Sequence, residues 1–154
     1  MSTNRITTLD RVGLDFIAKH EGGYKLVAYK CPAGVWTISA GVTFYPDGTR
    51  VKKGDSLILD EAVALFKTIV NHFEKTTDSF TRDDINQNQF NALVSFAYNV
   101  GLGNLKSSTL LKKVNANPTD PSIAKEFAKW NKANGKVLPG LVKRRLEEAN
   151  MYFS

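Results

Sequence analysis

The stretch HEGGYKLVAYKCPAGVWTISAG, residues 20–41, joins two kinds of sequence pattern. Before it, apolar residues within 12–17 recur at helical spacing, and the glycine pair Gly22-Gly23 predicts that the helix ends near Glu21. Within it, runs rich in β-branched and aromatic residues flank the turn sequence CPAG, which predicts a hairpin. The turn begins with Cys31, the only cysteine of the chain. A helix that leads into a hairpin therefore opens the fold.

The pattern on either side of this stretch predicts an α+β fold. Thr8 is the expected cap of the first helix. Two or three antiparallel strands are expected up to Val51, with YPDGT as a second turn. After Gly54 the apolar spacing is helical to the end, and we expect one domain, 1–154, in two parts, 8–58 and 59–154. The expected helices are 61–73 capped by Asp60, 86–101, 107–115 with a serine cap, 121–133 with Pro121 near its first position, and 138–153.

Aromatic residues at helical spacing in the second part predict its core. Periodic aromatics on helices normally pack against each other, and Trp130 is expected to pack with them. An indole at the edge of such a core is also able to stack on a sugar ring. The predicted core aromatics are Phe66, Phe73, Phe90, Phe96 and Phe127.

Composition excludes several classes of protein. With 154 residues, of which 42% are hydrophobic and 23% charged, the chain has enough apolar residues to bury a core. No apolar run is long enough to span a membrane, and Met1–Ile6 lacks the apolar core of a signal peptide. A single cysteine forms no internal disulfide and has no companions for a zinc site, so no metal or cofactor is expected.

The formal charge of +6 favours an anionic partner. The basic residues are spread along the chain, and the cluster Lys143-Arg144-Arg145 is followed directly by Glu147-Glu148. That mixed pattern is weak for nucleic-acid binding, so no nucleic-acid partner is expected.

Glu21, Cys31 and Thr37 suggest hydrolytic chemistry from their residue types alone. A carboxyl at a helix end beside a glycine pair can act as a general acid when its site is partly apolar. A thiol and a hydroxyl at one hairpin turn can polarise water. Glycoside hydrolysis needs such a pair, one group for the leaving oxygen and one for water or the sugar. The structural alternative is a solvated Glu21, a packed Cys31 and a strand-forming Thr37, and the residues alone leave both open.

The segment EGGYKLVAYKCPAGVWTIS resembles the N-terminal part of the phage-type lysozymes, the T4-like endolysins of glycoside hydrolase family 24. Ala28-Tyr29, Gly34 and Thr37-Ile38 match the family's hairpin motif. QNQFNALVSFAYNVG is similar to the family's central helix. SSTLLKKVN, the tryptophan of FAKWNKANGK, and LPGLVKRRLEEANMYF resemble its closing helices. The resemblance runs in order from about residue 8 to 154.

The resemblance implies roles for individual residues. Glu21 matches the catalytic glutamate, Thr37 matches a threonine that holds the nucleophilic water, and Cys31 stands at the position of the catalytic aspartate. A thiolate in that position would polarise the water or attack the sugar, and needs a lowered pKa to be ionised at neutral pH. Three positions of the helical part match residues that line the saccharide site, although helix packing or capping explains them equally well: Tyr98, Asn99 and Thr109.

Three departures from the family pattern stand out. One residue is inserted between Glu21 and Cys31, and we expect a bulge near the glycines to absorb it. Ser39 replaces a glycine and Val42 a histidine, for which altered packing is expected. The cysteine itself leaves the inverting and covalent routes both open.

The resemblance implies an endolysin that cleaves the β-1,4 bond between N-acetylmuramic acid and N-acetylglucosamine in bacterial peptidoglycan. A monomer is expected, held in the host cytoplasm until a holin permeabilises the membrane. The main alternative is a non-catalytic peptidoglycan-binding module on the same fold. A membrane-disrupting action of the amphipathic C-terminal helix is a third possibility and is compatible with either.

Overall fold

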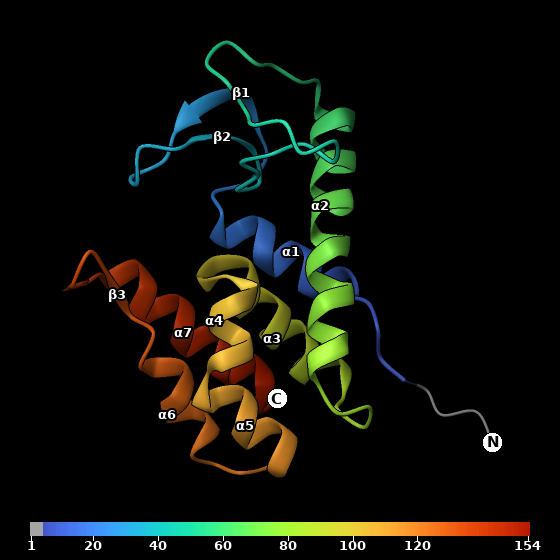
Figure 1. Cartoon of the computed structure of the whole chain (residues 1–154), viewed down its shortest axis with the longest axis vertical. Coiled ribbons are helices and arrows are strands. Elements are labelled where there is room, and N and C mark those ends of the chain that lie inside the picture. Colours follow the sequence, from blue (N-terminus) through green and yellow to red (C-terminus); the bar gives the residue numbers. More distant parts are fainter. Residues whose placement is uncertain (1–4) are drawn as a thin grey trace. The chain divides into compact units, whose positions relative to one another are not determined.

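The computed structural model describes residues 5–154 (Figure 1). Over that range the chain forms seven α-helices and two separate two-stranded antiparallel sheets, which confirms the predicted α+β class. The chain divides into two compact units. The sheet unit is Asp15–His72, and the helical unit comprises Phe73–Ser154 together with the described residues up to Leu14. Both boundaries fall inside helices, and the division at residue 58 expected from the sequence stays a prediction.

Helix α1, Arg11–His20, begins later than the sequence suggested. The cap is Asp10 rather than Thr8, because Asp10 Oδ1 accepts a hydrogen bond from the Gly13 amide at 2.9 Å. The same oxygen also accepts from Asn91 Nδ2 at 2.8 Å. A side chain that satisfies a free amide of the first turn, and is itself held by a buried amide, makes the better cap.

The main sheet pairs β1, Lys25–Lys30, with β2, Trp36–Ser39. Tyr29 lies opposite Thr37, and the register shifts between Lys25 and Tyr29. The irregularity therefore lies inside β1, a few residues after the glycine pair, and leaves the hairpin from Tyr29 onward in regular pairing. A bulge of this kind accommodates one extra residue, and its link to the residue inserted between Glu21 and Cys31 stays a prediction.

The other edge of β1 is also covered. The Ala28 amide donates to the Asp55 carbonyl at 2.9 Å, and the Leu57 amide donates to the Leu26 carbonyl at 2.8 Å. The predicted YPDGT turn forms, with the Gly48 amide bonded to the Tyr45 carbonyl. Hydrogen bonds on both edges stabilise β1, a short strand that would be only marginally stable in an isolated two-stranded hairpin.

Helix α2 runs over Leu59–Phe80 and is longer than predicted at both ends. Asp60 lies inside its first turn and is not the cap. Glu61 Oε1 accepts instead from the Ile58 amide at 3.0 Å, which is half of a capping box. In the sheet unit the buried side of the helix carries Ala62, Phe66, Ile69 and Val70.

The helical unit is built around α3, Gln87–Val100, whose residues from Gln89 to Ala97 are all buried. Asn86 and Gln89 form a complete capping box at its start. Ser108 caps α5, as predicted, through a bond from the Leu111 amide. The sequence did not predict the short α4, and α6 is shorter than expected because it begins after Pro121 and Ser122. The remaining helices are α4 Leu102–Ser107, α5 Thr109–Ala116, α6 Ile123–Ala128 and α7 Pro139–Tyr152.

A second hairpin replaces the end of the predicted helix 121–133. Strands β3, Lys132–Ala133, and β4, Lys136–Val137, pair around Asn134-Gly135. Both turn residues have positive φ, 52° and 78°. Asn-Gly is the preferred pair for a two-residue turn of this kind, so the local turn preference overrides the helical pattern.

Phe96 is the centre of the aromatic core of the helical unit. Its ring makes edge contacts with Phe127 at 5.7 Å and with Trp130 at 5.5 Å, so Trp130 packs as predicted. Phe90, Phe96 and Phe127 are fully buried in this unit, and the predicted core residue Phe66 is fully buried in the sheet unit. Phe73 is only half-buried and lies 4.9 Å from the ring of Tyr98.

A buried ionic network joins α7 to α3. Glu148 is fully buried and pairs with Arg144 at 3.3 Å and Arg145 at 2.8 Å. Ser95 Oγ of α3 donates to the same carboxylate at 2.6 Å. Two of the three basic residues in the C-terminal cluster are therefore structural, and only Lys143 is exposed.

Within the described residues, no helix has the combination of length and apolar character required for a membrane span. Residues 1–4, which form part of the N-terminal stretch expected to lack a signal peptide, lie outside the described range.

Candidate active site

Glu21 lies where α1 ends. Its amide still makes a helical bond to the Ile17 carbonyl at 3.0 Å, and Gly22 and Gly23 then turn the chain with φ values of 88° and 82°. The Glu21 side chain lies against the backbone of Gly41, where a Cβ would come within 2.8 Å of Glu21 Cδ. The missing side chain at residue 41 makes room for the carboxylate.

Cys31 opens the turn between β1 and β2. Its carbonyl accepts from the Gly34 amide at 2.8 Å, and its own amide donates to the Val35 carbonyl at 2.9 Å. The side chain is partly exposed and is a free thiol. The turn thus fixes the backbone of Cys31 and leaves its side chain partly exposed.

The turn also favours the thiolate form of Cys31. Burial raises the pKa of the thiol, but hydrogen bonds from the backbone of Val35 and Ala33 and from the Thr37 hydroxyl together lower it by more, so that the pKa lies below its ordinary value. Donors directed at a sulfur stabilise its anion. The ionised fraction at neutral pH is therefore larger than that of a free cysteine.

Thr37 is almost fully buried in β2 and faces the same turn. Its hydroxyl donates to the Val35 carbonyl at 2.9 Å and also lies within reach of the Cys31 sulfur. A hydroxyl has a single hydrogen, so it serves one of these acceptors at a time. Ionisation of the thiol favours the bond to sulfur.

Tyr29 links these residues. Burial raises the pKa of its phenol, and the negative charges of Glu21 and Cys31 raise it further. Both groups therefore lie close enough to Tyr29 to act on it electrostatically, while Thr37 is its partner across the sheet. Glu21, Cys31 and Thr37 all lie in the sheet unit, the first two within electrostatic range of Tyr29 and the third opposite it in the sheet.

The two replaced positions after Thr37 are both buried. Ser39 has a φ of 55°, a region where a side chain is strained, and its hydroxyl donates to the Ala62 carbonyl of α2 at 2.6 Å. Val42 is 1% exposed, and its amide and carbonyl pair with Ile38. The tight loop between them carries Gly41. Ser39 thus anchors to α2 the loop that faces Glu21.

The three expected saccharide-binding residues lie in the helical unit. Tyr98 and Asn99 are in the last turn of α3, and Thr109 is the first residue of α5, with α4 between them. Asn99 is exposed, and its Oδ1 accepts from Arg145 Nη2 at 2.8 Å. Because arginine only donates, the amide oxygen faces Arg145 and the amide NH₂ group points away from it. Thr109 is exposed at its helix start.

Two neighbours of the catalytic candidates were not singled out from the sequence. In the sequence Tyr29 is only a match to a family motif, and Gly41 is only the last residue of the stretch 20–41. A glycine after a strand signals a turn, but only folding shows which side chain packs on it. The described residues contain no cluster of His, Cys, Asp and Glu suited to a metal ion.

Comparisons with known proteins show the family of the chain. Residues 19–148 match the family model described as phage lysozyme. The endolysin of Bacillus phage B103 is 40% identical over 146 residues, which are 95% of this chain and 54% of that protein. The endolysin of Salmonella phage P22 is 32% identical and covers 100% of this chain and 98% of its own length. The chain belongs to the phage lysozyme family.

A solved structure supports the same assignment. The endolysin from Escherichia coli O157:H7 phage FAHEc1 superposes with a TM-score of 0.85 at 34% identity, over 96% of this chain and 94% of that one. The chain nevertheless spans only about half the length of the two Bacillus phage relatives that it matches, 54% and 55%. The lysozyme fold is therefore shared with proteins of quite different total length.

Proposed function

We propose that the chain is a muramidase that hydrolyses the β-1,4 bond between N-acetylmuramic acid and N-acetylglucosamine in bacterial peptidoglycan. The observation that carries the proposal is the grouping of Glu21, Cys31 and Thr37 around Tyr29, in a chain that matches the phage lysozyme family over residues 19–148. A carboxyl and a second ionisable group beside one bond are the requirements of glycoside hydrolysis.

Glu21 is the general acid of the proposed reaction. Its proton passes to the glycosidic oxygen as the bond to the anomeric carbon breaks. The packing of its side chain on Gly41 supports this role, since a proton donor needs a defined position. No cofactor or metal takes part.

Cys31 takes the part that an aspartate plays in the related enzymes. As a thiolate it either accepts a proton from water while the water oxygen bonds to the anomeric carbon, or attacks that carbon itself. Thr37 holds the water or the thiolate through its single hydroxyl hydrogen. The configuration of the released sugar, followed by NMR at early times, distinguishes inversion by water from retention through a covalent intermediate.

Tyr98, Asn99 and Thr109 are the proposed saccharide contacts in the helical unit. Asn99 supports this best, because its exposed amide is oriented by Arg145 and offers NH donors to a sugar. The partner is the peptidoglycan wall. We further propose a monomer that acts on the wall after release from the host cytoplasm with the help of a holin.

Mass spectrometry of fragments released from purified peptidoglycan tests the activity, with Glu21→Gln as the paired variant. We expect disaccharide peptides that end in reducible muramic acid. We expect Glu21→Gln to release them about 10²- to 10⁴-fold more slowly, because general acid catalysis contributes a factor of that size. Intact wall binding without any released sugar would favour the non-catalytic binding module.

Alkylation tests the thiol. Cys31 is the only cysteine, so iodoacetamide modifies one defined site and should abolish lysis. Cys31→Asp should retain activity and resist the reagent, while Cys31→Ser should be much less active than Cys31→Asp. Full activity of Cys31→Ala would remove the cysteine from the mechanism.

A further inference from the structure

The outer side of α7 and the hairpin before it carry large apolar side chains that the fold leaves uncovered. Their exposed fractions lie between 41% and 59%. Leu138, Val142 and Leu146 follow each other at intervals of four, so they form one line along the helix. We call this set of five residues the α6–α7 face: Val137, Leu138, Val142, Leu146 and Phe153.

These residues belong to one continuous surface. A groove of about 280 Å³ runs between α6 and α7, and Val142, Leu146 and Phe153 line it. Alanines 124, 128 and 149 contribute to its lining, together with Asn131. The Leu138 amide donates to the Asn131 carbonyl at 3.0 Å, which joins the hairpin end to the groove. From Val142 to Phe153 the line is roughly 16 Å long at the helical rise.

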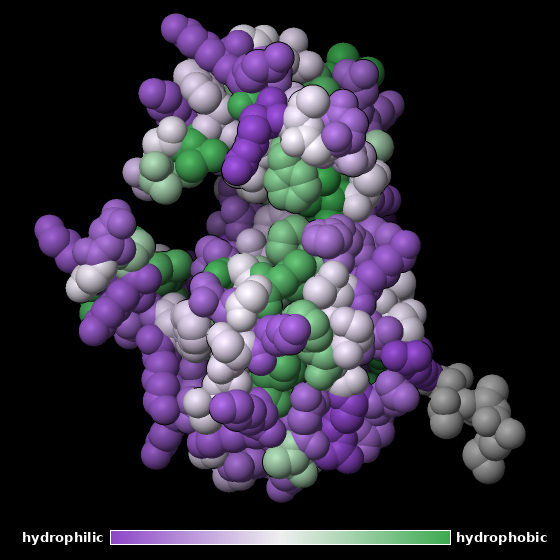
Figure 2. Space-filling view, viewed as in Figure 1, coloured by the Kyte–Doolittle hydropathy of each residue, from purple (hydrophilic) through white to green (hydrophobic). Residues whose placement is uncertain are grey.

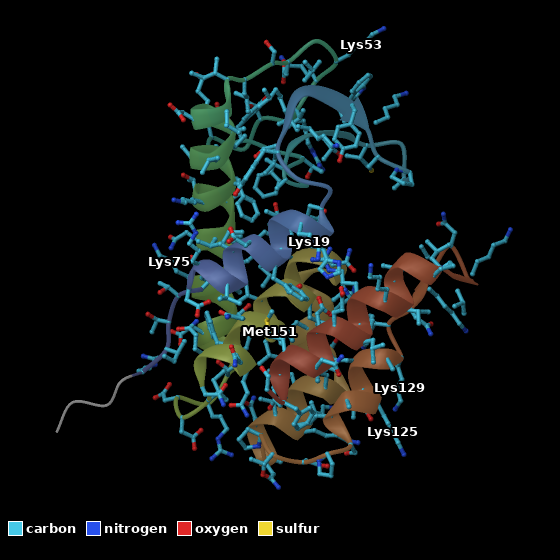
Figure 3. The ribbon with its side chains drawn as sticks, turned by 180° about the vertical axis from the view of Figure 1, so that it is seen from behind. Lys19, Lys53, Lys75, Lys125, Lys129 and Met151 are labelled. Carbon is cyan, nitrogen blue, oxygen red and sulfur yellow. The ribbon has the colours of Figure 1, made fainter. Side chains whose placement is uncertain are left out.

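The segment that carries the α6–α7 face has an excess of positive charge. Between Pro121 and Ser154 the sequence has seven basic and three acidic residues. Two of the basic residues and Glu148 form the buried network, so the exposed charge is dominated by lysine. Lys125 lies on α6 and Lys129 directly after it, where Figure 3 shows them, and Lys129 pairs with Glu126 at 3.0 Å. The hairpin and α7 add Lys132, Lys136 and Lys143, all exposed.

The hairpin projects from the helical unit. Figure 1 shows this hairpin, labelled at β3, at the edge of the unit, and every residue from 132 to 140 is exposed, on both strands. Figure 2 shows hydrophobic atoms among hydrophilic ones in this region. Val137 lies opposite Lys132 in the two-residue ladder, so an apolar and a cationic side chain stand side by side at the base of the exposed hairpin.

We propose that the α6–α7 face docks the chain on a membrane surface that contains anionic lipid. Val137 and Leu138 enter the headgroup layer, the groove takes an acyl chain, and the surrounding lysines bind lipid phosphates. Apolar groups that project beside flexible cations are typical of interfacial binding. The contact is reversible and peripheral, and it needs no catalytic residue.

Charge and shape favour this occupant over the alternatives. A second copy of the chain would bring two lysine-rich rims together, and like charges disfavour that. A purely anionic polymer would use the lysines but leave the apolar line exposed to water. An acidic protein helix would fill the groove, yet it would leave the projecting Val137 without a partner, whereas a lipid layer accommodates both.

Flotation with vesicles tests the proposal on the full chain. The vesicles contain equal parts phosphatidylcholine and phosphatidylglycerol, with phosphatidylcholine alone as the neutral reference. We expect binding to the anionic vesicles that weakens as NaCl is raised. Val137→Ser/Leu146→Ser should lower the partition coefficient at least about tenfold, because two exposed apolar side chains lose their burial in the lipid. Both positions are more than half exposed, so the fold is retained.

Matched control variants test whether vesicle binding depends on the α6–α7 face or only on the general hydrophobicity and charge of the surface. Ile58→Ser/Leu59→Ser removes two side chains that are 64% and 55% exposed in the sheet unit, and should bind as the parent does. Lys132→Gln/Lys136→Gln/Lys143→Gln should weaken binding about fivefold for each lysine. Lys53→Gln/Lys67→Gln/Lys75→Gln lowers the net charge equally and should have a much smaller effect.

Several results would overturn the proposal. The first is that the chain binds neutral and anionic vesicles equally well. The second is that the triple lysine variant of the face and the triple lysine control lose the same amount of binding. The third is that Val137→Ser/Leu146→Ser binds as the parent does. Binding to poly-L-glutamate but not to anionic vesicles would assign the face to an acidic protein instead. Glu21→Gln should dock normally, so the outcome does not depend on whether the chain is a muramidase.

Discussion

Residue 31 shows how a backbone turn tunes a side chain. Partial burial raises the pKa of the Cys31 thiol, but the backbone of Val35 and Ala33 and the hydroxyl of Thr37 outweigh burial and bring the pKa below its ordinary value. If the thiolate is the active form, activity rises as the pH rises through that pKa. An aspartate in the same place ionises at far lower pH, since free thiols and aspartates differ by about 4.6 pH units.

We therefore expect Cys31→Asp to move the low-pH limb of the kcat/KM profile to lower pH by more than about one unit. Peptidoglycan turbidity assays across the pH range measure it. Cys31→Ser, which has no titrating group at this position, should be slow and should lose the limb. A limb that stays in place in Cys31→Asp would show that another group controls it.

Residue 41 controls the position of Glu21 by lacking a side chain. Gly41→Ala would place a methyl group 2.8 Å from Glu21 Cδ, at a φ of 73° where alanine is strained. We expect a loss of stability of about 1 kcal/mol from the backbone and a loss of activity on the order of 10²-fold from the displaced carboxylate. Thermal unfolding and kcat separate the two effects.

Gly48→Ala is the control for that variant. Gly48 has a φ of 89°, and no atom lies within 4 Å of the place that an added methyl group would take, so the substitution brings the strain without the contact. It should lose a similar amount of stability and keep its activity. Equal activity of the two variants would mean that Gly41 does not position Glu21.

At the scale of elements, α7 is attached to α3 by charge as well as by apolar packing. Phe96 receives the edges of Phe127 and Trp130, and the Arg145 guanidinium lies 5.1 Å from its ring centre. The arginines are held in turn by the buried carboxylate of Glu148. A network of this kind is sensitive to the loss of one member, because the remaining charges are then buried without compensation.

We expect Glu148→Gln to destabilise the fold by about 3–5 kcal/mol, because two guanidinium groups lose their buried counter-charge. Urea unfolding of the helical signal measures the change. Asp83→Asn makes the same chemical change in a surface pair, where Asp83 is 71% exposed and lies 2.9 Å from Arg5. It should cost less than about 1 kcal/mol. Equal effects would contradict a structural role for the network.

For the whole molecule, the formal charge of +6 should govern encounter with an anionic wall. Salt shortens the Debye length from about 10 Å at 0.1 M to about 3 Å at 1 M. The apparent KM on whole peptidoglycan should therefore rise severalfold over that range, while the folded state, followed by circular dichroism, stays the same. The variant Lys53→Gln/Lys67→Gln/Lys75→Gln should show a flatter response. A KM independent of salt would exclude electrostatic attraction to the wall.

Local sequence signals were sufficient for much of the fold. The helix that ends at Gly22-Gly23, the turn at CPAG and the Ser108 cap depend on neighbouring residues, so spacing and turn chemistry predict them. The family motifs around Glu21, Cys31 and Thr37 are likewise short stretches. The Asn134-Gly135 pair is also a local turn signal, but the helical spacing of the preceding residues predicts a helix over 121–133 instead.

Tertiary structure decided what lies far apart in the sequence. The contact between Glu21 and Gly41, the bond from Ser39 to Ala62 and the pairing of Glu148 with Ser95 each join separate elements. Asp10 caps α1 in place of the predicted Thr8, because Asn91 of α3 donates a hydrogen bond to the Asp10 carboxylate. Periodicity reports which side of an element is apolar, but a partner in another element is chosen by packing and by the need to satisfy buried polar groups.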